Sequence, residues 1–176
     1  EEKDKSRVVM LNHNMERKGC KYGFDALHIV KEHCPALEVD LFGVPAAPAN
    51  LPNWVHYYQT PDKETHNLLY NRAAIYLAPS VIEGWGLTVG EAMMCGQAVV
   101  CTDNRGFREM AEHEVNALMV PVKDSQALAD AIIRLMVDDE LRCRIARAGH
   151  ASIQRFTWDN SYAKLRELFG IERTTS

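Results

Sequence analysis

The chain has 176 residues, of which 47% are hydrophobic and 25% are charged; this is the composition of a globular domain and excludes a disordered chain. Its 20 basic and 24 acidic side chains leave a net charge of −4, so a nucleic acid is not expected as a partner. No apolar run approaches the roughly 18 residues of a membrane span. The five cysteines are scattered and form no Cys-x-x-Cys pair, which favours free thiols in a reducing, cytoplasmic compartment over a disulfide framework or a zinc site.

Short apolar runs alternate with longer helical patterns along the chain. The runs predict six strands, which in chain order are 8–11, 37–42, 54–58, 74–78, 98–101 and 117–120. Apolar residues at three- and four-residue spacing predict the helices. These are 22–31, 62–72, 88–95, a short one at 107–112, one capped by Asp124 or Ser125, and two in the tail at 140–156 and 158–169.

This regular alternation predicts right-handed βαβ units, and therefore an α/β, Rossmann-like, doubly wound parallel sheet of about six strands with a helical C-terminal tail. Val8–Leu11 and Ala98–Cys101 are continuous apolar runs, as expected for strands that are buried on both faces. No repeat or linker divides residues 1–176, so we expect a single domain. Ligands of such sheets bind beyond the carboxyl ends of the strands, and functional residues are expected in those loops.

The loop after the fourth strand carries the densest set of candidate residues. Residues 79–93 read Pro-Ser-Val-Ile-Glu-Gly-Trp-Gly-Leu-Thr-Val-Gly-Glu-Ala-Met. Gly84 and Gly86 permit tight turns, and the following helix directs its free amides and its positive dipole end at the loop. This arrangement suits a phosphate group. Glu83 precedes the glycines, and Glu91 lies one to two turns into the helix.

The same residues also admit a purely structural interpretation. Thr88-x-x-Glu91 is the pattern of a capping box, in which the glutamate only satisfies backbone donors at the start of the helix. Glycine loops also precede helices in α/β proteins that bind no phosphate. In this interpretation Glu91 is a capping residue and the segment holds no ligand.

Glu83-x7-Glu91, within this segment, resembles the signature of retaining glycosyltransferase family 4, whose GT-B enzymes use nucleotide sugars. Further stretches match the family's motifs in the same order: 95–100, 105–109, 116–120 and 156–158. Five ordered motifs are a specific signal. The resemblance is good from Ile75 to Phe169 and looser before that. The chain is therefore similar to the C-terminal, donor-binding half of a GT-B enzyme.

The resemblance implies a role for each matching residue. Glu91 would accept hydrogen bonds from the ribose hydroxyls of the nucleotide, and Glu83 would hold hydroxyls of the donor sugar. Backbone amides of the turn and of the helix start would hold the diphosphate. The donor-binding set implied in this way comprises Glu91, Gly84, Gly86, Leu87 and Thr88.

The first loop departs from the family's Gly-Arg-x4-Lys-Gly pattern. Residues 12–19 read Asn-His-Asn-Met-Glu-Arg-Lys-Gly, so Lys18 is retained, but His13 stands where the family has arginine. Lys18 would bind the donor phosphates, and Lys18 and Glu83 are the predicted catalytic residues. His13, included among the donor-binding candidates, either donates to a phosphate or has no role. Arg17 either supplies the missing charge or is a solvated loop residue.

By this resemblance the reaction is the transfer of a sugar from a nucleoside diphosphate to an acceptor hydroxyl with retention, without a metal or another cofactor. Lys18 and the helix start would stabilise the leaving diphosphate. A reaction on one face of the sugar and a double displacement through a carboxylate nucleophile both stay open. The alternatives are a non-catalytic nucleotide-sugar-binding module and a GT-B-fold sugar epimerase, which lacks the Glu-x7-Glu spacing.

The expected partners are the nucleotide-sugar donor and an N-terminal GT-B domain that residues 1–176 do not include. Without that domain the chain is expected to bind the donor but not to transfer sugar. The family setting is polysaccharide or glycoconjugate biosynthesis in the cytoplasm, where the full-length enzyme can associate with the inner face of a membrane. In the family the last helix packs on the N-terminal domain, so we expect the segment from Trp158 to Phe169 either to lie loosely or to expose Tyr162, Leu165 and Phe169.

Other residues are expected to have structural roles. Met93 and Met94 should pack beneath the sheet. His66 should be a surface or packing histidine, whereas His56 either lines the nucleotide pocket or plays no part in it.

Overall fold

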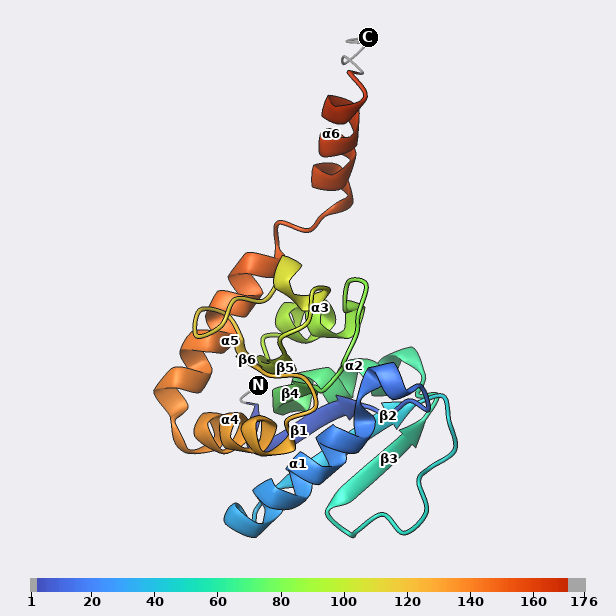
Figure 1. The fold of residues 1–176 in the computed structure, drawn as a ribbon, viewed down its shortest axis with the longest axis vertical. Helices are drawn as coiled ribbons and strands as arrows, with labels where there is room; N and C mark the ends of the chain where they lie inside the picture. The colour runs from blue at the N-terminus through green and yellow to red at the C-terminus, as the bar shows by residue number, and fades with distance from the viewer. Residues whose placement is uncertain (1–2, 171–176) are drawn as a thin grey trace.

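The computed structural model describes residues 3–170 and confirms the predicted α/β architecture (Figure 1). Six parallel strands form one sheet in the order β3-β2-β1-β4-β5-β6. The strands are β1 (Asp4–Leu11), β2 (Glu38–Gly43), β3 (Val55–Gln59), β4 (Ala73–Ala78), β5 (Ala98–Thr102) and β6 (Leu118–Val120). The chain builds outward from β1 to one edge and then returns to β4, so the switch point between β1 and β4 is the place where this fold class binds ligands.

Helices cover both faces of the sheet. They are α1 (Cys20–His33), α2 (Lys63–Arg72), α3 (Leu87–Met94), α4 (Ser125–Val137), α5 (Asp139–Ile153) and α6 (Trp158–Leu168), with 3-10 turns η1 (Glu16–Lys18) and η2 (Phe107–Glu109). Buried residues of α1 and α4 belong to the cluster on one face of the sheet. Buried residues of α2 and α3 belong to the cluster on the opposite face.

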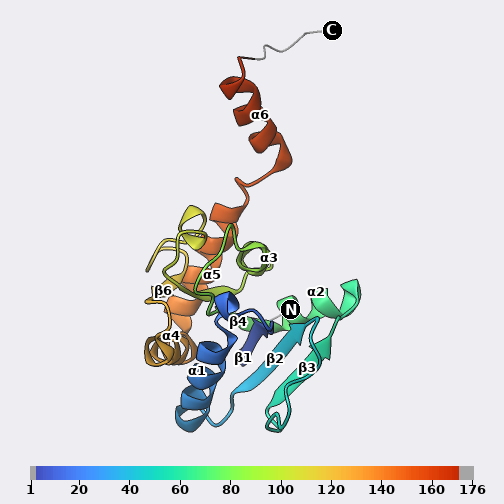
Figure 2. The ribbon, with the colours of Figure 1, turned by 45° about the vertical axis from the view of Figure 1, so that its right-hand side comes forward.

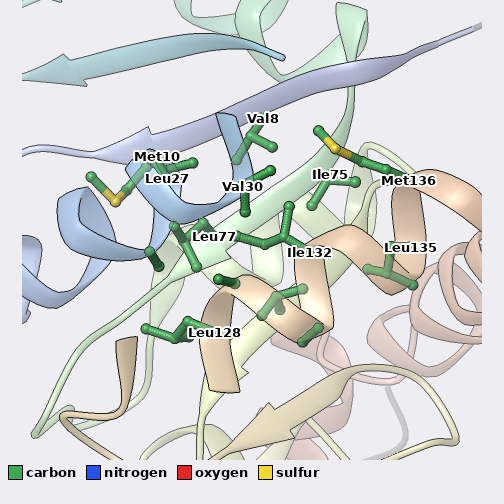
Figure 3. Packing of buried hydrophobic residues seen from close by; sticks show 14 of the residues in the cluster. Val8, Met10, Leu27, Val30, Ile75, Leu77, Leu128, Ile132, Leu135 and Met136 are labelled. Atoms are coloured by element: carbon green, nitrogen blue, oxygen red, sulfur yellow. The ribbon is translucent and has the colours of Figure 1, made fainter. Parts of the chain in front are cut away.

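Strand side chains alternate between these two clusters. Val8 and Met10 of β1 join the α1/α4 cluster, whereas Val9 joins the α2/α3 cluster. Successive Cβ atoms of a strand point to opposite faces, so a strand covered on both sides must be apolar at every position. Figure 3 shows the α1/α4 side, where Leu27 and Ile132 pack over the sheet. The prediction of doubly buried strands is therefore confirmed.

The element bounds differ from the predicted ones mainly at loops. The helix expected at 107–112 is only the three-residue turn η2. The last strand is shortened to Leu118–Val120, and α1 begins at Cys20, directly after Gly19 with φ +62°. Of the two candidate caps for α4, Asp124 is the N-cap, and its side chain accepts a hydrogen bond from the Ala127 amide.

The tail helix α6 stands away from the rest of the molecule (Figures 1 and 2). None of its residues is buried, and the side chains of Trp158, Tyr162, Leu165 and Leu168 are exposed, as is Phe169 directly after it. The expectation of exposed apolar residues in this segment is confirmed. Among residues 3–170, no helix is both long enough and apolar enough to cross a bilayer.

Candidate functional site at the carboxyl edge of β1 and β4

The loop between β4 and α3 is tied to the two neighbouring loops. The Ser80 carbonyl accepts a hydrogen bond from the hydroxyl of Thr102, the last residue of β5. It accepts a second, at 3.0 Å, from the side-chain amide of Asn104, which follows β5. From the β1 side, the Arg17 carbonyl accepts from the Val81 amide at 2.8 Å. These bonds fix the first half of the loop because the carboxyl ends of β1, β4 and β5 meet at one edge of the sheet.

Gly86 forms the turn from this loop into α3. Its φ of +86° lies in the left-handed region, and a Cβ there would lie 2.4 Å from the Phe107 ring, so a side chain has neither the backbone conformation nor the space. The helix begins at Leu87 and has no side-chain cap. The amides of Leu87 and Thr88 have no partner within the helix and are available to an anion.

The capping-box interpretation is wrong. Thr88 lies inside α3 and does not cap it, since Gly86 is the N-cap residue. The Glu91 carboxylate accepts a hydrogen bond from the Tyr70 hydroxyl of α2 at 3.0 Å. Glu91 is therefore oriented by a neighbouring helix and not by the backbone at the start of its own helix.

Glu83 and Lys18, the two predicted catalytic residues, form an ion pair. The Lys18 Nζ lies 2.6 Å from Glu83 Oε1, and the two side chains are only 17% and 9% exposed. The Ser80 hydroxyl donates to the same carboxylate oxygen at 2.8 Å, and the Arg17 guanidinium lies 3.7 Å from Oε2. The structure thus assembles two cations and one largely buried carboxylate at the switch point.

The Glu91 side chain lines a pocket of about 460 Å³. Polar side chains of α2 and apolar side chains of α3 face each other across it, and the loop residue Trp85 and the end of α5 complete it. The lining residues are Lys63, His66, Asn67, Tyr70, Trp85, Leu87, Gly90, Glu91, Met94, Cys95, Ile153 and Phe156. This size is within the usual range for small-molecule sites.

The α2 side of this pocket is absent from the sequence-based candidates. His66, expected to be a surface or packing residue, packs its ring edge-on against Phe42 and Tyr70 and leaves a buried Nε2 without a hydrogen-bond partner. Met94, expected beneath the sheet, is exposed and lines the pocket, whereas Met93 is buried as expected. No local motif marks these residues, because their role depends on α2 lying next to α3.

Burial raises the pKa of the Tyr70 phenol well above its ordinary value, and the neighbouring Tyr76 and the Glu91 carboxylate raise it further. The phenol therefore stays protonated and acts as a hydrogen-bond donor to Glu91 at neutral pH. One oxygen of the Glu91 carboxylate is thereby held, while the other is left to accept from a ligand.

The structure does not bring His13 or His56 into the Glu91 pocket. The His13 ring Nδ1 accepts from the Met15 amide at 3.0 Å, and His13 lines a separate cavity of about 570 Å³ together with Arg17 and Lys123. His56 pairs with Glu38 at 2.6 Å. Across residues 3–170, no group of three or more His, Cys, Asp or Glu side chains is arranged to hold a metal ion.

The comparisons with known proteins agree with this architecture. A family model described as "Glycosyl transferases group 1" matches residues 1–152. The chain is 34% identical over 100 residues to a D-inositol 3-phosphate glycosyltransferase of Xylanimonas cellulosilytica, an alignment that covers 57% of this chain and 24% of that protein. The matched region is thus about a quarter of the length of that curated relative.

Solved structures share the fold. The C-terminal domain of the glycosyl transferase group 1 family protein LpcC from Francisella tularensis matches with a TM-score of 0.74 at 22% identity and covers 85% of both chains. Anabaena Alr3699/HepE, solved in complex with UDP and glucose, matches with a TM-score of 0.79 at 24% identity and covers 93% of this chain and 48% of that one. At these identities the likeness shows the fold.

Proposed function

The chain belongs to the glycosyl transferases group 1 family, and we propose that it is the donor-binding half of a retaining GT-B transferase that moves a sugar from a nucleoside diphosphate to an acceptor hydroxyl. One observation carries the proposal. The Lys18–Glu83 ion pair joins the β1–α1 loop to the loop that leads to the uncapped start of α3, and Glu91 on that helix lines a pocket. In the proposal, the sugar lies at the ion pair, the diphosphate lies at the start of α3, and the nucleoside lies in the Glu91 pocket.

In this proposal the nucleoside occupies the Glu91 pocket. Tyr70 holds Glu91 Oε2, so Oε1 accepts from the vicinal hydroxyls of the ribose. Leu87 and Met94 offer apolar surface to the base, while Lys63 and Asn67 offer polar groups. The solved complex of Alr3699/HepE with UDP and glucose supports a nucleotide-sugar ligand for this fold.

The diphosphate lies against the start of α3. The amides of Leu87 and Thr88 donate to its oxygens, and the Lys18 ammonium, which pairs with Glu83, supplies a full positive charge. As the sugar leaves, negative charge grows on the diphosphate, and these fixed donors stabilise it without reorganising. We propose that they also make a metal ion unnecessary.

Glu83 holds hydroxyls of the donor sugar. Its Oε1 already accepts hydrogen bonds from Lys18 and Ser80, so both lone-pair positions of that oxygen are occupied. A carboxylate whose oxygen already accepts two hydrogen bonds is suited to binding the hydroxyls of the sugar and not to attacking its anomeric carbon. This favours the reaction on one face of the sugar over a double displacement through Glu83.

The proposal includes an N-terminal domain that carries the acceptor, since the region matched in the curated relative is 24% of its length. A role in polysaccharide or glycoconjugate assembly in the cytoplasm belongs to the same proposal and is supported by the family resemblance. The domain alone is expected to bind the donor but to catalyse no transfer.

Titration calorimetry on the 176-residue chain tests the proposal, with UDP, GDP and ADP and their nucleosides as ligands. We expect one diphosphate to bind with a Kd of roughly tens of micromolar to millimolar, because the open site leaves each charge screened by water. Lys18→Ala should weaken that diphosphate about tenfold or more and leave its nucleoside unchanged, since a hydrogen bond to a charged group contributes about 1.5–3 kcal/mol.

Glu91→Gln should weaken the diphosphate and the nucleoside equally, because both contain the ribose. Lys21→Ala is the matched control, because Lys21 is an exposed lysine whose ammonium forms an ion pair with Asp25. If no diphosphate binds the wild type, or if Glu91→Gln binds like the wild type, the proposed site is wrong.

A further inference from the structure

The second half of the β4–α3 loop is held differently from the first. The backbone of Ser80 and Val81 is fixed by hydrogen bonds from neighbouring loops. Within the described residues, no hydrogen bond ends on Gly84 or Trp85, although these two residues join Glu83 to the first amides of α3. Side-chain packing must therefore hold this stretch in place.

The packing partner of Trp85 comes from the linker between α5 and α6. The rings of Trp85 and Phe156 meet edge to face, with their centroids 4.9 Å apart and their planes at 81°. Edge-to-face geometry at this distance is the favoured arrangement of two aromatic rings and is directional, so it constrains the orientation of the indole.

Arg155, the residue before Phe156, ties the linker to two neighbouring elements. The Arg155 guanidinium lies over the Phe156 ring at 4.9 Å, and the same guanidinium donates to the Glu109 carbonyl of η2 at 3.2 Å. On the other side, the Asn160 side chain in the first turn of α6 donates to the Arg155 carbonyl at 2.7 Å. The linker thus has a fixed position set jointly by η2 and α6.

We propose that Phe156 is a positioning residue for the donor loop: acting through the Trp85 ring, it sets the orientation of the Gly84–Gly86 turn and hence of the Leu87 and Thr88 amides. The inference rests on the proposed function, because those amides are assigned to the diphosphate. It gives Phe156, which also lines the Glu91 pocket, a second role, because the placement of α6 is transmitted through it to the diphosphate amides.

The test compares Phe156→Ala, Phe156→Leu and Phe156→Tyr with Phe169→Ala in the 176-residue chain. Phe169 is an exposed ring beside α6 that lies outside the Trp85 contact, so its removal is the matched control. Phe156→Leu keeps an apolar side chain and removes the ring edge, whereas Phe156→Tyr keeps the ring.

Two readouts are needed. The first is the set of backbone NMR order parameters of residues 84–88 without ligand, and the second is calorimetry with UDP and with uridine. For Phe156→Ala and Phe156→Leu we expect lower order parameters confined to 84–88, and a loss of affinity that is two- to tenfold larger for UDP than for uridine, which meets Phe156 only as part of the Glu91 pocket. Phe156→Tyr should keep the order parameters of 84–88 and the affinity for UDP close to those of the wild type, and Phe169→Ala should match the wild type.

The proposal is overturned if the order parameters of 84–88 are unchanged in Phe156→Leu, or if order parameters fall throughout the sheet, which would indicate a purely structural role. It is also overturned if UDP binds the wild type and Phe156→Leu equally. If UDP does not bind the wild type while the order parameters change as expected, the positioning of the loop stands and the assignment of its ligand fails.

Discussion

Asp40 and Trp158 reverse the usual relation between residue type and burial. Asp40, in the middle of β2, is fully buried, and its carboxylate binds Arg72 at 2.8 Å and Arg7 at 3.1 Å. Trp158, at the start of α6, is 91% exposed and packs into neither core cluster. In this chain burial follows the presence of a partner: the sheet supplies two guanidinium groups to a carboxylate, whereas the described residues supply no core to α6.

The largest expected effect comes from breaking the buried ion pairs. Asp40→Ala leaves Arg7 and Arg72 without their shared carboxylate and should lower the free energy of unfolding by about 3–5 kcal/mol. Urea unfolding followed by circular dichroism measures it. The control is Asp25→Ala, which breaks an exposed pair with Lys21 and should change stability by less than about 1 kcal/mol. Equal losses in the two variants would contradict the comparison.

The next effect concerns the turn before α3. Gly86→Ala forces a side chain into positive φ and against the Phe107 ring, so we expect a loss of about 1–3 kcal/mol. Thermal unfolding of Gly86→Ala and Gly84→Ala provides the comparison, because a Cβ at Gly84 meets no atom within 4 Å. A similar melting temperature for both variants would show that the turn relaxes freely.

The buried phenols predict an alkaline limit to stability. Burial, first among the causes, raises the pKa of both Tyr70 and Tyr76 in the folded chain above the ordinary value near 10. Above that pH the unfolded chain loses the phenolic protons and the folded chain keeps them. The contribution of the two phenols to the free energy of unfolding is therefore fully present below about pH 10. Above this pH it falls by about 1.4 kcal/mol per pH unit for each phenol.

Urea unfolding between pH 9.5 and 11.5 measures this slope, with tyrosinate absorbance as the direct probe of ionisation. Tyr70→Phe should reduce the slope by about one phenol's share. An unchanged slope in this variant would mean that Tyr70 ionises normally in the folded chain.

The smallest effect is expected on α6. Leu165→Ala removes a half-exposed side chain and should change the free energy of unfolding by less than about 0.5 kcal/mol. The same substitution at Leu135 on α4, which is fully buried, should cost about 2–5 kcal/mol. Denaturant titration of the two variants side by side decides the point. A loss at Leu165 that approaches the loss at Leu135 would show that α6 is packed in solution.

The elements that depend on neighbours in the sequence were predicted well. Short apolar runs identified all six strands, and the glycines of residues 79–93 identified the turn into α3. The prediction for 107–112 was wrong because Phe107 packs into the core and against Gly86, so the chain forms a single turn there and not a helix. The prediction that Met94 packs beneath the sheet was wrong for a similar reason, because the position of α2 decides which side of α3 is covered.

The candidate site divides in the same way. The Glu83-x7-Glu91 spacing is visible in the sequence, because both carboxylates lie on one loop–helix segment. The pairing of Lys18 with Glu83 spans 65 positions, and the bond from Tyr70 to Glu91 spans 21. These contacts depend on the placement of β1, α2 and β4 around the switch point. No local pattern encodes that placement.

The sequence by itself determined the layered α/β fold and the segment that carries the two glutamates, because periodicity and turn chemistry act over a few residues. The tertiary structure alone decided that Lys18 meets Glu83, that α2 forms one side of the Glu91 pocket, and that Phe156 meets Trp85. The first two contacts join residues brought together by the parallel crossovers, and the third depends on α5 packing against α3. Their geometry follows from the packing of whole elements, which no single stretch of sequence specifies.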